Sequence, residues 1–241
     1  MAKVIKSAGT FEILTPYKEL REQLKRIEIA GRTCYQSLKG KVTNKSASNF
    51  ISMLIKRGHL SVIEHSSLTV RFKNLSRGFT HELVRHRLCS FSQESTRYVD
   101  YAKGCDKPDL DRFQIVVIAP PHKDENEKIK LENGRELSFK DMINEVEMFY
   151  RGLRKAGWAP EDARQILPTG LKAEIVVTAN FREWMHIMYL RTSKFAHWEI
   201  RSVMIDLLKR LKKILPPIFE PFHIVGKDIN GIPYTETDGV F

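Results

Sequence analysis

Residues 68–98 read LTVRFKNLSRGFTHELVRHRLCSFSQESTRY and predict a strand followed directly by a helix. The apolar positions 68, 70 and 72 alternate with polar ones, as they do in a half-exposed β-strand. Ser76 is a typical N-cap residue and predicts a helix over residues 77–87. The rest of the segment is polar, and we expect it to form a loop.

Outside this segment, helices and strands alternate without the regular strand–helix–strand rhythm of a doubly wound sheet. Periodicity predicts helices over residues 17–29, 48–56, 141–156, 160–167, 181–192 and 196–215, and strands within 4–15 and over 115–119 and 172–178. Residues 122–140 are charged and poorly periodic, which indicates an exposed segment. Neither an internal repeat nor a Gly-, Ser- or Pro-rich linker divides the chain. We therefore expect one α+β domain over residues 1–241.

The composition is that of a globular protein. Of the 241 residues, 42% are hydrophobic and 29% are charged, which argues against a disordered or low-complexity chain. No uncharged apolar stretch approaches the length of a membrane span, and the N-terminus lacks the apolar core of a secretory signal. The three cysteines, Cys34, Cys89 and Cys105, form no disulfide or zinc pattern. We expect reduced thiols, a cytoplasmic protein and no membrane partner.

The net charge of +11 indicates an anionic partner without identifying it. Nucleic acid, an acidic membrane and a phosphorylated small molecule would all suit this excess of Lys and Arg. The basic residues are widely spread, and no nucleic-acid-binding motif is present, so we expect no nucleic-acid partner. Two alternatives to an enzyme stay open from composition alone: a nucleic-acid-binding protein, and an α+β protein without a site.

Residues 85–98 carry the densest group of chemically active side chains. Arg85 and Arg87 flank His86, and a further guanidinium, Arg97, closes the segment. Guanidinium groups match phosphate and pyrophosphate oxygens bidentately. The alternative is that this cationic cluster only complements the dipole at a helix C-terminus. The adjoining hydroxyls and amide favour a binding site.

A metal site is not expected. His81 and His86 are five residues apart, which places them far apart around a helix. For two other groups, anion binding and an ordinary solvated surface role both stay open, because spacing does not decide between them. Arg182 and His186 share one helix face, and Arg164 precedes Pro168 in an apolar setting.

Together these motifs resemble the flavin-dependent thymidylate synthase family. Its signature is R-H-R, seven residues and Ser, which matches Arg85-His86-Arg87 and Ser95 here. The accompanying motifs occur in the same order along the chain: GHLS at 58–61, ARQILP at 163–168, N-x-R at 180–182, LR at 190–191 and WEI at 198–200. The resemblance spans about residues 20–220.

The resemblance implies a homotetramer with an antiparallel-rich sheet flanked by helices, and active sites shared between subunits. It implies bound FAD, dUMP as substrate, methylenetetrahydrofolate as one-carbon donor and NADPH as reductant. The products would be dTMP and tetrahydrofolate, within dTTP biosynthesis.

The resemblance also implies a role for each matching residue. Residues expected to contact FAD are Ser61, Arg85, His86, Arg87, Gln93, Asn180, Arg182 and His186, with His59 and Glu64 near the flavin. Residues expected to contact dUMP are Glu82, Leu83, Val84, Arg85, Gln93, Glu94, Ser95, Thr96, Arg97, Arg164 and Arg191. Several positions depart from the family pattern: Glu82 replaces a common Gln, His186 an occasional Asn, and Phe195 and His197 a common His and Gln.

Two residues are expected to act in catalysis. Uracil C5 must become nucleophilic, either by addition of a thiolate or alkoxide at C6 or by stabilisation of negative charge at N3 and O4. Cys89 lies outside the motif, and no adjacent histidine activates Ser95. We therefore favour electrostatic activation by Arg191, with Ser95 orienting the substrate.

Overall fold

The computed structural model describes residues 2–37, 40–103 and 114–239. The chain forms two compact units. The first unit comprises residues 1–9, 73–82 and 93–175, and the second comprises residues 10–72, 83–92 and 176–241. The expectation of one domain over the whole chain stays a prediction, and each unit is described by itself.

A four-stranded sheet has the order β2 (Thr10–Ile13), β3 (Ser67–Ser76), β8 (Lys172–Asn180), β4 (Cys89–Gln93), and the boundaries of the two units fall within its last three strands. Strands β3 and β8 are antiparallel. The Thr69 hydroxyl meets that of Thr178 at 2.9 Å, whereas the N–H of Arg77 donates to the carbonyl of Leu171. Residue numbers therefore rise along β3 as they fall along β8. The α+β class with an antiparallel sheet is confirmed.

The first unit combines short strands with a helical layer. Here β1 (Lys3–Ile5) pairs in parallel with β5 (Val116–Ile118), and β6 (Ile129–Lys130) forms a hairpin with β7 (Glu136–Leu137). The helices are α4 (Phe139–Lys155), α5 (Pro160–Ala163) and the short 3₁₀ helix η4 (Arg164–Ile166). A buried cluster that includes Tyr101, Val117 and Tyr150 forms the core.

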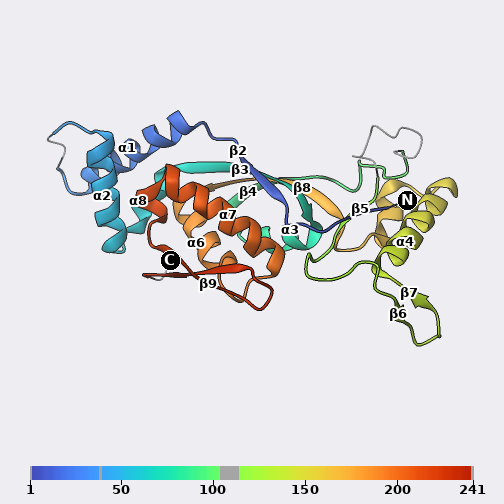
Figure 1. Ribbon diagram of the computed structural model, residues 1–241. Helices are drawn as coiled ribbons and strands as arrows, with labels where there is room; N and C mark the ends of the chain where they lie inside the picture. The colour runs from blue at the N-terminus through green and yellow to red at the C-terminus, as the bar shows by residue number, and fades with distance from the viewer. Residues whose placement is uncertain (1, 38–39, 104–113, 240–241) are drawn as a thin grey trace. The chain divides into compact units, whose positions relative to one another are not determined.

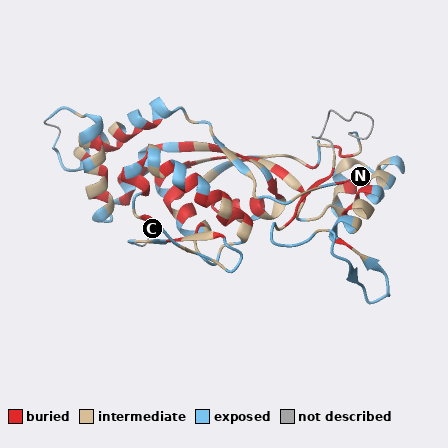
Figure 2. Ribbon diagram, viewed as in Figure 1, coloured by how far each residue is buried: buried red, intermediate tan, exposed pale blue. Residues whose placement is uncertain are grey.

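The second unit is mainly helical. It contains α1 (Tyr17–Cys34), α2 (Asn44–Lys56), η1 (Leu60–His65), α6 (Phe181–Arg191), α7 (Trp198–Ile214) and α8 (Pro216–Phe219), followed by the antiparallel hairpin of β9 (Phe222–Lys227) and β10 (Pro233–Thr237). Helices α6 and α7 contact each other (Figure 1). Their buried residues form much of this unit's core (Figure 2).

Local signals predicted most element starts correctly. The Ser76 hydroxyl accepts the N–H of Phe79 at 3.1 Å and caps α3 (Arg77–Leu83). The Asn180 side chain caps α6, as expected. In the described part of the chain, no helix has the combination of length and apolarity that a bilayer span requires.

Several boundaries were wrong. The helix that starts at Arg77 ends at Leu83 rather than near residue 87, so His86 lies beyond it. Residues 89–93 form the edge strand β4 instead of a loop. Its residues, CSFSQ, alternate between apolar and polar positions, but the run is short and three of its five residues are Ser or Gln, so pairing in the sheet contributes to its extended form. The segment 122–140 contains the β6–β7 hairpin, and the helix predicted over 160–167 divides into α5 and η4.

Candidate active site

Helix α6 positions a row of polar side chains along one face. Asn180 Oδ1 accepts the N–H of Glu183 at 2.8 Å, which fixes the first turn. Trp184 is fully buried, and its indole N–H donates to the Leu68 carbonyl at 2.9 Å. This anchoring sets the rotation of the helix, so that Glu183 faces inward and His186 follows on the same side.

The Arg85-His86-Arg87 motif forms a turn after α3. The N–H of His86 donates to the Leu83 carbonyl at 3.2 Å. Within this turn the imidazole is buried, whereas Arg85 and Arg87 are exposed. The motif therefore presents two guanidinium groups to solvent around one enclosed histidine.

These two segments line one cavity of about 550 Å³. Its lining residues are Arg85, His86, Arg87, Leu88, Glu183, His186, Leu190 and Arg191. The volume is within the range typical of ligand sites. The walls combine cations with an exposed apolar edge, since Leu88 and Leu190 contribute aliphatic surface. Such a wall suits a ligand with both anionic and planar apolar parts.

His86 is the polar centre of this cavity wall. The Nε–H of Arg191 donates to His86 Nε2 at 3.0 Å, and His86 Nδ1 lies 3.4 Å from a Glu183 carboxylate oxygen. The His186 ring meets the His86 ring edge-on, with centroids 5.6 Å apart. Burial, with smaller contributions from the nearby Arg191 and His186, lowers the pKa of His86 to about 4. The imidazole is therefore neutral at pH 7, and its contact with Glu183 is not an ion pair.

Two neighbouring groups also respond to burial. Burial raises the pKa of the Glu183 carboxyl, and His186 opposes this shift. Burial and the nearby Glu183 together raise the pKa of the Cys89 thiol to about 12. Cys89 is therefore a thiol at neutral pH, which disfavours it as a thiolate nucleophile.

The other predicted flavin residues of the second unit lie on exposed surface. Arg182 Nη1 contacts a Glu64 carboxylate oxygen at 2.6 Å, and both side chains are roughly half exposed. Ser61 is exposed on η1, and His59 just before it accepts or donates a 2.7 Å hydrogen bond with the Tyr35 hydroxyl. Glu64, placed near the flavin by resemblance, is thus the partner of Arg182 as well.

The predicted nucleotide residues at 93–97 are consecutive in the first unit, and each is held by a hydrogen bond. The Gln93 amide donates to the Thr80 hydroxyl at 2.7 Å, and Glu94 accepts the Tyr101 hydroxyl at 2.8 Å. The hydroxyl of Ser95 accepts the N–H of Arg97 at 3.3 Å.

Two arginines, one outside this group and one within it, supply its cationic donors. Arg164 Nη1 donates to the buried Thr96 hydroxyl at 3.2 Å, so helix η4 contributes a guanidinium to it. Arg97 pairs with Glu161 at 2.9 Å. The substrate residues expected from the sequence are therefore divided: Glu82, 93–97 and Arg164 belong to the first unit, and Leu83, Val84, Arg85 and Arg191 to the second.

Some residues of these groups were missed from the sequence. Glu183 was not predicted to have a role, and only its burial, which is unusual for an acid, distinguishes it from its neighbour Arg182. Thr80, the partner of Gln93, was also missed, and no local pattern distinguishes it.

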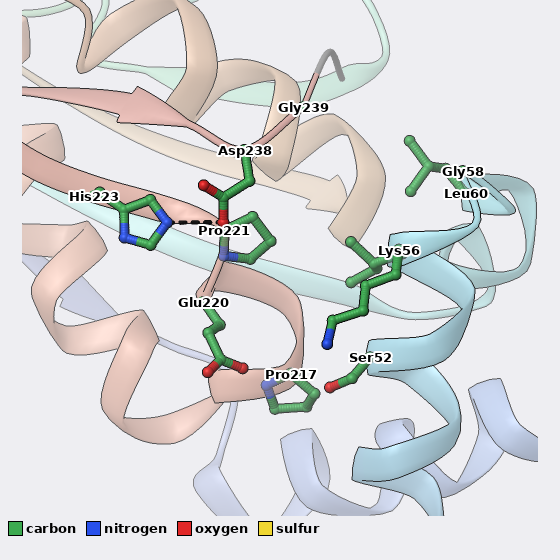
Figure 3. Close-up of a pocket in the computed structure, with 11 residues that line it drawn as sticks. Ser52, Lys56, Gly58, Leu60, Pro217, Glu220, Pro221, His223, Asp238 and Gly239 are labelled. Carbon is green, nitrogen blue, oxygen red and sulfur yellow. Dashed lines mark hydrogen bonds and ion pairs between the residues drawn. The ribbon is translucent and has the colours of Figure 1, made fainter.

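A second cavity, of about 610 Å³, lies elsewhere in the second unit (Figure 3). It is lined by residues of α2, of α8 and the turn after it, and of the C-terminal hairpin and its end, among them Lys56, Glu220 and the 2.9 Å pair of His223 and Asp238. None of the predicted site residues lines it. Its charges are mixed in sign and exposed, so they favour no particular ligand.

Comparison with known proteins relates the whole arrangement to one family. Residues 17–217 match the family model described as "Thymidylate synthase complementing protein" (Thy1). Among curated proteins, a flavin-dependent thymidylate synthase of Geobacter sulfurreducens is 35% identical over 198 residues, covering 80% of this chain and 79% of that protein. One of Mycolicibacterium gilvum is 37% identical over 212 residues, covering 83% and 80%.

Solved structures share the fold. The thymidylate synthase X of Helicobacter pylori, determined with FAD and dUMP, superposes with a TM-score of 0.60 at 23% identity over 88% of this chain and 97% of that one. The UMP/dUMP methylase of Streptomyces cacaoi, bound with 5-Br UMP, gives a TM-score of 0.62 at 21% identity over 90% and 94%.

Proposed function

The chain belongs to the Thy1 family of flavin-dependent thymidylate synthases, and on this premise we propose how its own residues serve the conversion of dUMP to dTMP. FAD is the cofactor and dUMP the substrate. The observation that carries the proposal is the second-unit cavity where Arg191 is hydrogen-bonded to a buried, neutral His86. The family membership favours a phosphorylated small molecule over nucleic acid as the partner of this basic chain, and it excludes a protein without a site.

The residues around the cavity fit the flavin cofactor. Arg85 and Arg87 are exposed at its wall and can hold pyrophosphate oxygens bidentately. The aliphatic surface of Leu88 and Leu190 suits a planar ring. We assign His86, His186, Asn180, Arg182, Gln93, Ser61 and His59 to the same cofactor, as the family motif implies. When bound, FAD supplies the hydride and carbon-transfer chemistry.

We assign the substrate mainly to the hydrogen-bonded group at 93–97. Arg97 and Arg164 supply cationic donors for the dUMP phosphate, and Ser95 orients the nucleotide. Glu82, Leu83, Val84, Arg85, Gln93, Glu94 and Thr96 complete this assignment, as the family motif implies. The Arg97 Nε–H pairs with Glu161, and because that pair is exposed, Arg97 can exchange it for a phosphate at little cost.

Arg191 is the residue assigned to activate the pyrimidine. As C5 of uracil becomes nucleophilic, negative charge grows at N3 and O4. A guanidinium there stabilises the transition state more than bound dUMP, which is what acceleration requires. The high pKa of the Cys89 thiol supports this route over addition of that cysteine to C6.

The remaining parts of the proposal concern co-substrates and assembly. Methylenetetrahydrofolate donates the carbon and leaves as tetrahydrofolate, and NADPH reduces the flavin. The chain assembles as a homotetramer with shared active sites and resides in the cytoplasm. These statements follow from the family resemblance.

The test begins with purified protein. We expect a yellow protein with flavin absorbance that makes dTMP from dUMP, methylenetetrahydrofolate and NADPH. Arg87→Ala and Arg182→Ala should each weaken FAD retention by roughly 1.5–3 kcal/mol, the value of a charge-assisted hydrogen bond. Arg26→Ala, which removes an exposed arginine of α1, is the control and should retain FAD. Full flavin content in both site variants after dialysis would refute the cofactor assignment, and a steep salt dependence of polynucleotide binding without dTMP formation would favour a nucleic-acid protein.

A further inference from the structure

Glu183 is a buried acid in the cavity wall to which the assignments above give no role. Only 7% of its surface is exposed, although isolated carboxylates are rarely buried. Its carboxylate oxygen lies 3.4 Å from His86 Nδ1, on the opposite side of the ring from Arg191. Glu183 thus lies beside one ring nitrogen of His86, and Arg191 is hydrogen-bonded to the other.

The direction of the Arg191 hydrogen bond determines where the His86 proton lies. A guanidinium only donates hydrogen bonds, so His86 Nε2 must accept and cannot carry a proton. The single proton of the neutral ring is therefore on Nδ1, the nitrogen that faces Glu183. A carboxylate beside that nitrogen stabilises this tautomer by accepting from it.

We propose that Glu183 is a positioning residue for the methylation of dUMP: it holds His86 in the Nδ1–H tautomer, and His86 in turn holds the Arg191 guanidinium in the cavity wall. This inference rests on the proposed function, which makes Arg191 the group that activates uracil. Without Glu183, the ring is free to take the Nε2–H form. That form would set two N–H donors against each other and break the Arg191–His86 hydrogen bond.

The surrounding charges do not perform this task. Arg85 and Arg87 line the same cavity but are cationic and cannot accept from Nδ1. His186 meets the ring edge-on. Cys89 is a thiol and a weak acceptor. Glu183 is the carboxylate among the residues that line this cavity in the described part of the chain.

The experiment compares Glu183→Gln and Glu183→Ala in the FAD-loaded enzyme. Nitrogen NMR of ¹⁵N-histidine protein at pH 7, assigned with His86→Gln, reports which ring nitrogen carries the proton. We expect Nδ1–H in the wild type and in Glu183→Gln, whose amide oxygen can still accept. In Glu183→Ala the Nδ1–H population should fall and kcat for dTMP formation should drop roughly tenfold, as when an outer partner of a functional histidine is removed. FAD content and KM for dUMP should stay near wild type.

Glu28→Ala is the matched control, because Glu28 is also buried in the second unit and pairs with Arg32 in α1. It should leave the tautomer and kcat unchanged. An Nε2–H or doubly protonated His86 in the wild type would overturn the proposal. A tautomer shift without loss of kcat, a loss of kcat without the shift, or no change in either, would overturn it as well. If the wild type made no dTMP, the proposed function would fail. The NMR measurement of the His86 tautomer in wild type and Glu183→Ala would still test whether Glu183 sets that tautomer.

Discussion

Arg191 in the second unit and Arg97 in the first are both assigned to dUMP, yet they contact chemically different partners. Arg191 donates to His86, a neutral imidazole that is itself buried. Arg97 pairs with the carboxylate of Glu161, and the two side chains are 55% and 49% exposed. A neutral acceptor orients a guanidinium without cancelling its charge, whereas a carboxylate cancels much of it.

This difference matches the task assigned to each arginine. A group that stabilises a transition state works best when it is already oriented before the reaction. A group that captures a phosphate can be held loosely, since exposed ion pairs contribute only about 0–1 kcal/mol and exchange partners readily. The comparison therefore predicts that changes at Arg191 affect turnover and that changes at Arg97 affect binding.

Replacement of Arg191 should have the largest effect. Arg191→Ala should lower dUMP methylation on the order of 100–1,000-fold at saturating dUMP, because one preorganised donor is lost. Arg191→Lys should recover only part, since lysine keeps the charge but lacks the planar fork. Oxidation of NADPH should persist in both variants if FAD stays bound, and the two half-reactions are measured separately. Full recovery of methylation at high dUMP would assign Arg191 to ground-state binding only.

The buried histidine should make stability depend on pH. His86 has a pKa of about 4 in the folded protein and near 6.5 when unfolded, so the unfolded chain binds more protons between these values. The free energy of unfolding should fall by roughly 3 kcal/mol as pH drops from about 6.5 to 4. The raised pKa of Glu183 acts in the opposite direction.

The measurement for His86 is denaturant unfolding across this pH range, compared with His86→Gln. The difference between the two proteins isolates the histidine from Glu183 and other groups. The wild type should lose more stability than the variant on acidification. Parallel curves would show that His86 titrates normally and is not enclosed by the cavity wall.

Variants of the exposed Arg97–Glu161 pair should change KM for dUMP rather than kcat. Arg97→Ala should raise KM for dUMP about tenfold while kcat changes little, because a charge-assisted contact to the phosphate is lost. Glu161→Gln should leave stability within about 1 kcal/mol and keep KM equal or lower, since a carboxylate no longer competes with the phosphate for Arg97. Initial rates over a range of dUMP concentrations check both. A kcat effect at Arg97 as large as at Arg191 would contradict the comparison.

Replacement of the three cysteines should have the smallest effect on turnover. Cys34 is exposed, the pKa of Cys89 is raised to about 12, and Cys105 lies outside the described residues. A variant with all three replaced by Ser or Ala should keep turnover, apart from a modest loss of stability from altered packing. Loss of dTMP formation with FAD and dUMP still bound would instead indicate thiolate addition to C6.

Local sequence predicted the starts of elements well, because N-caps and prolines act on their own neighbours. Ser76, Asn180 and Pro160 each begin a helix where expected. Thr43 was missed as the cap of α2, although its capping box with Ser46 could have been read from the sequence. The strand β4 was missed, because its apolar–polar alternation is only five residues long and includes two Ser and a Gln, which also suit a loop.

The sequence by itself determined the family and the reaction, because the R-H-R motif, Ser95 and their accompanying segments stand in a recognisable order. It also indicated which arginines to examine. Only the tertiary structure decided that Glu183, His86 and Arg191 meet, since His86 and Arg191 are 105 residues apart in the chain. The tautomer of a histidine and the pKa of an acid depend on burial and on what lies across each ring nitrogen, and long-range packing alone sets both.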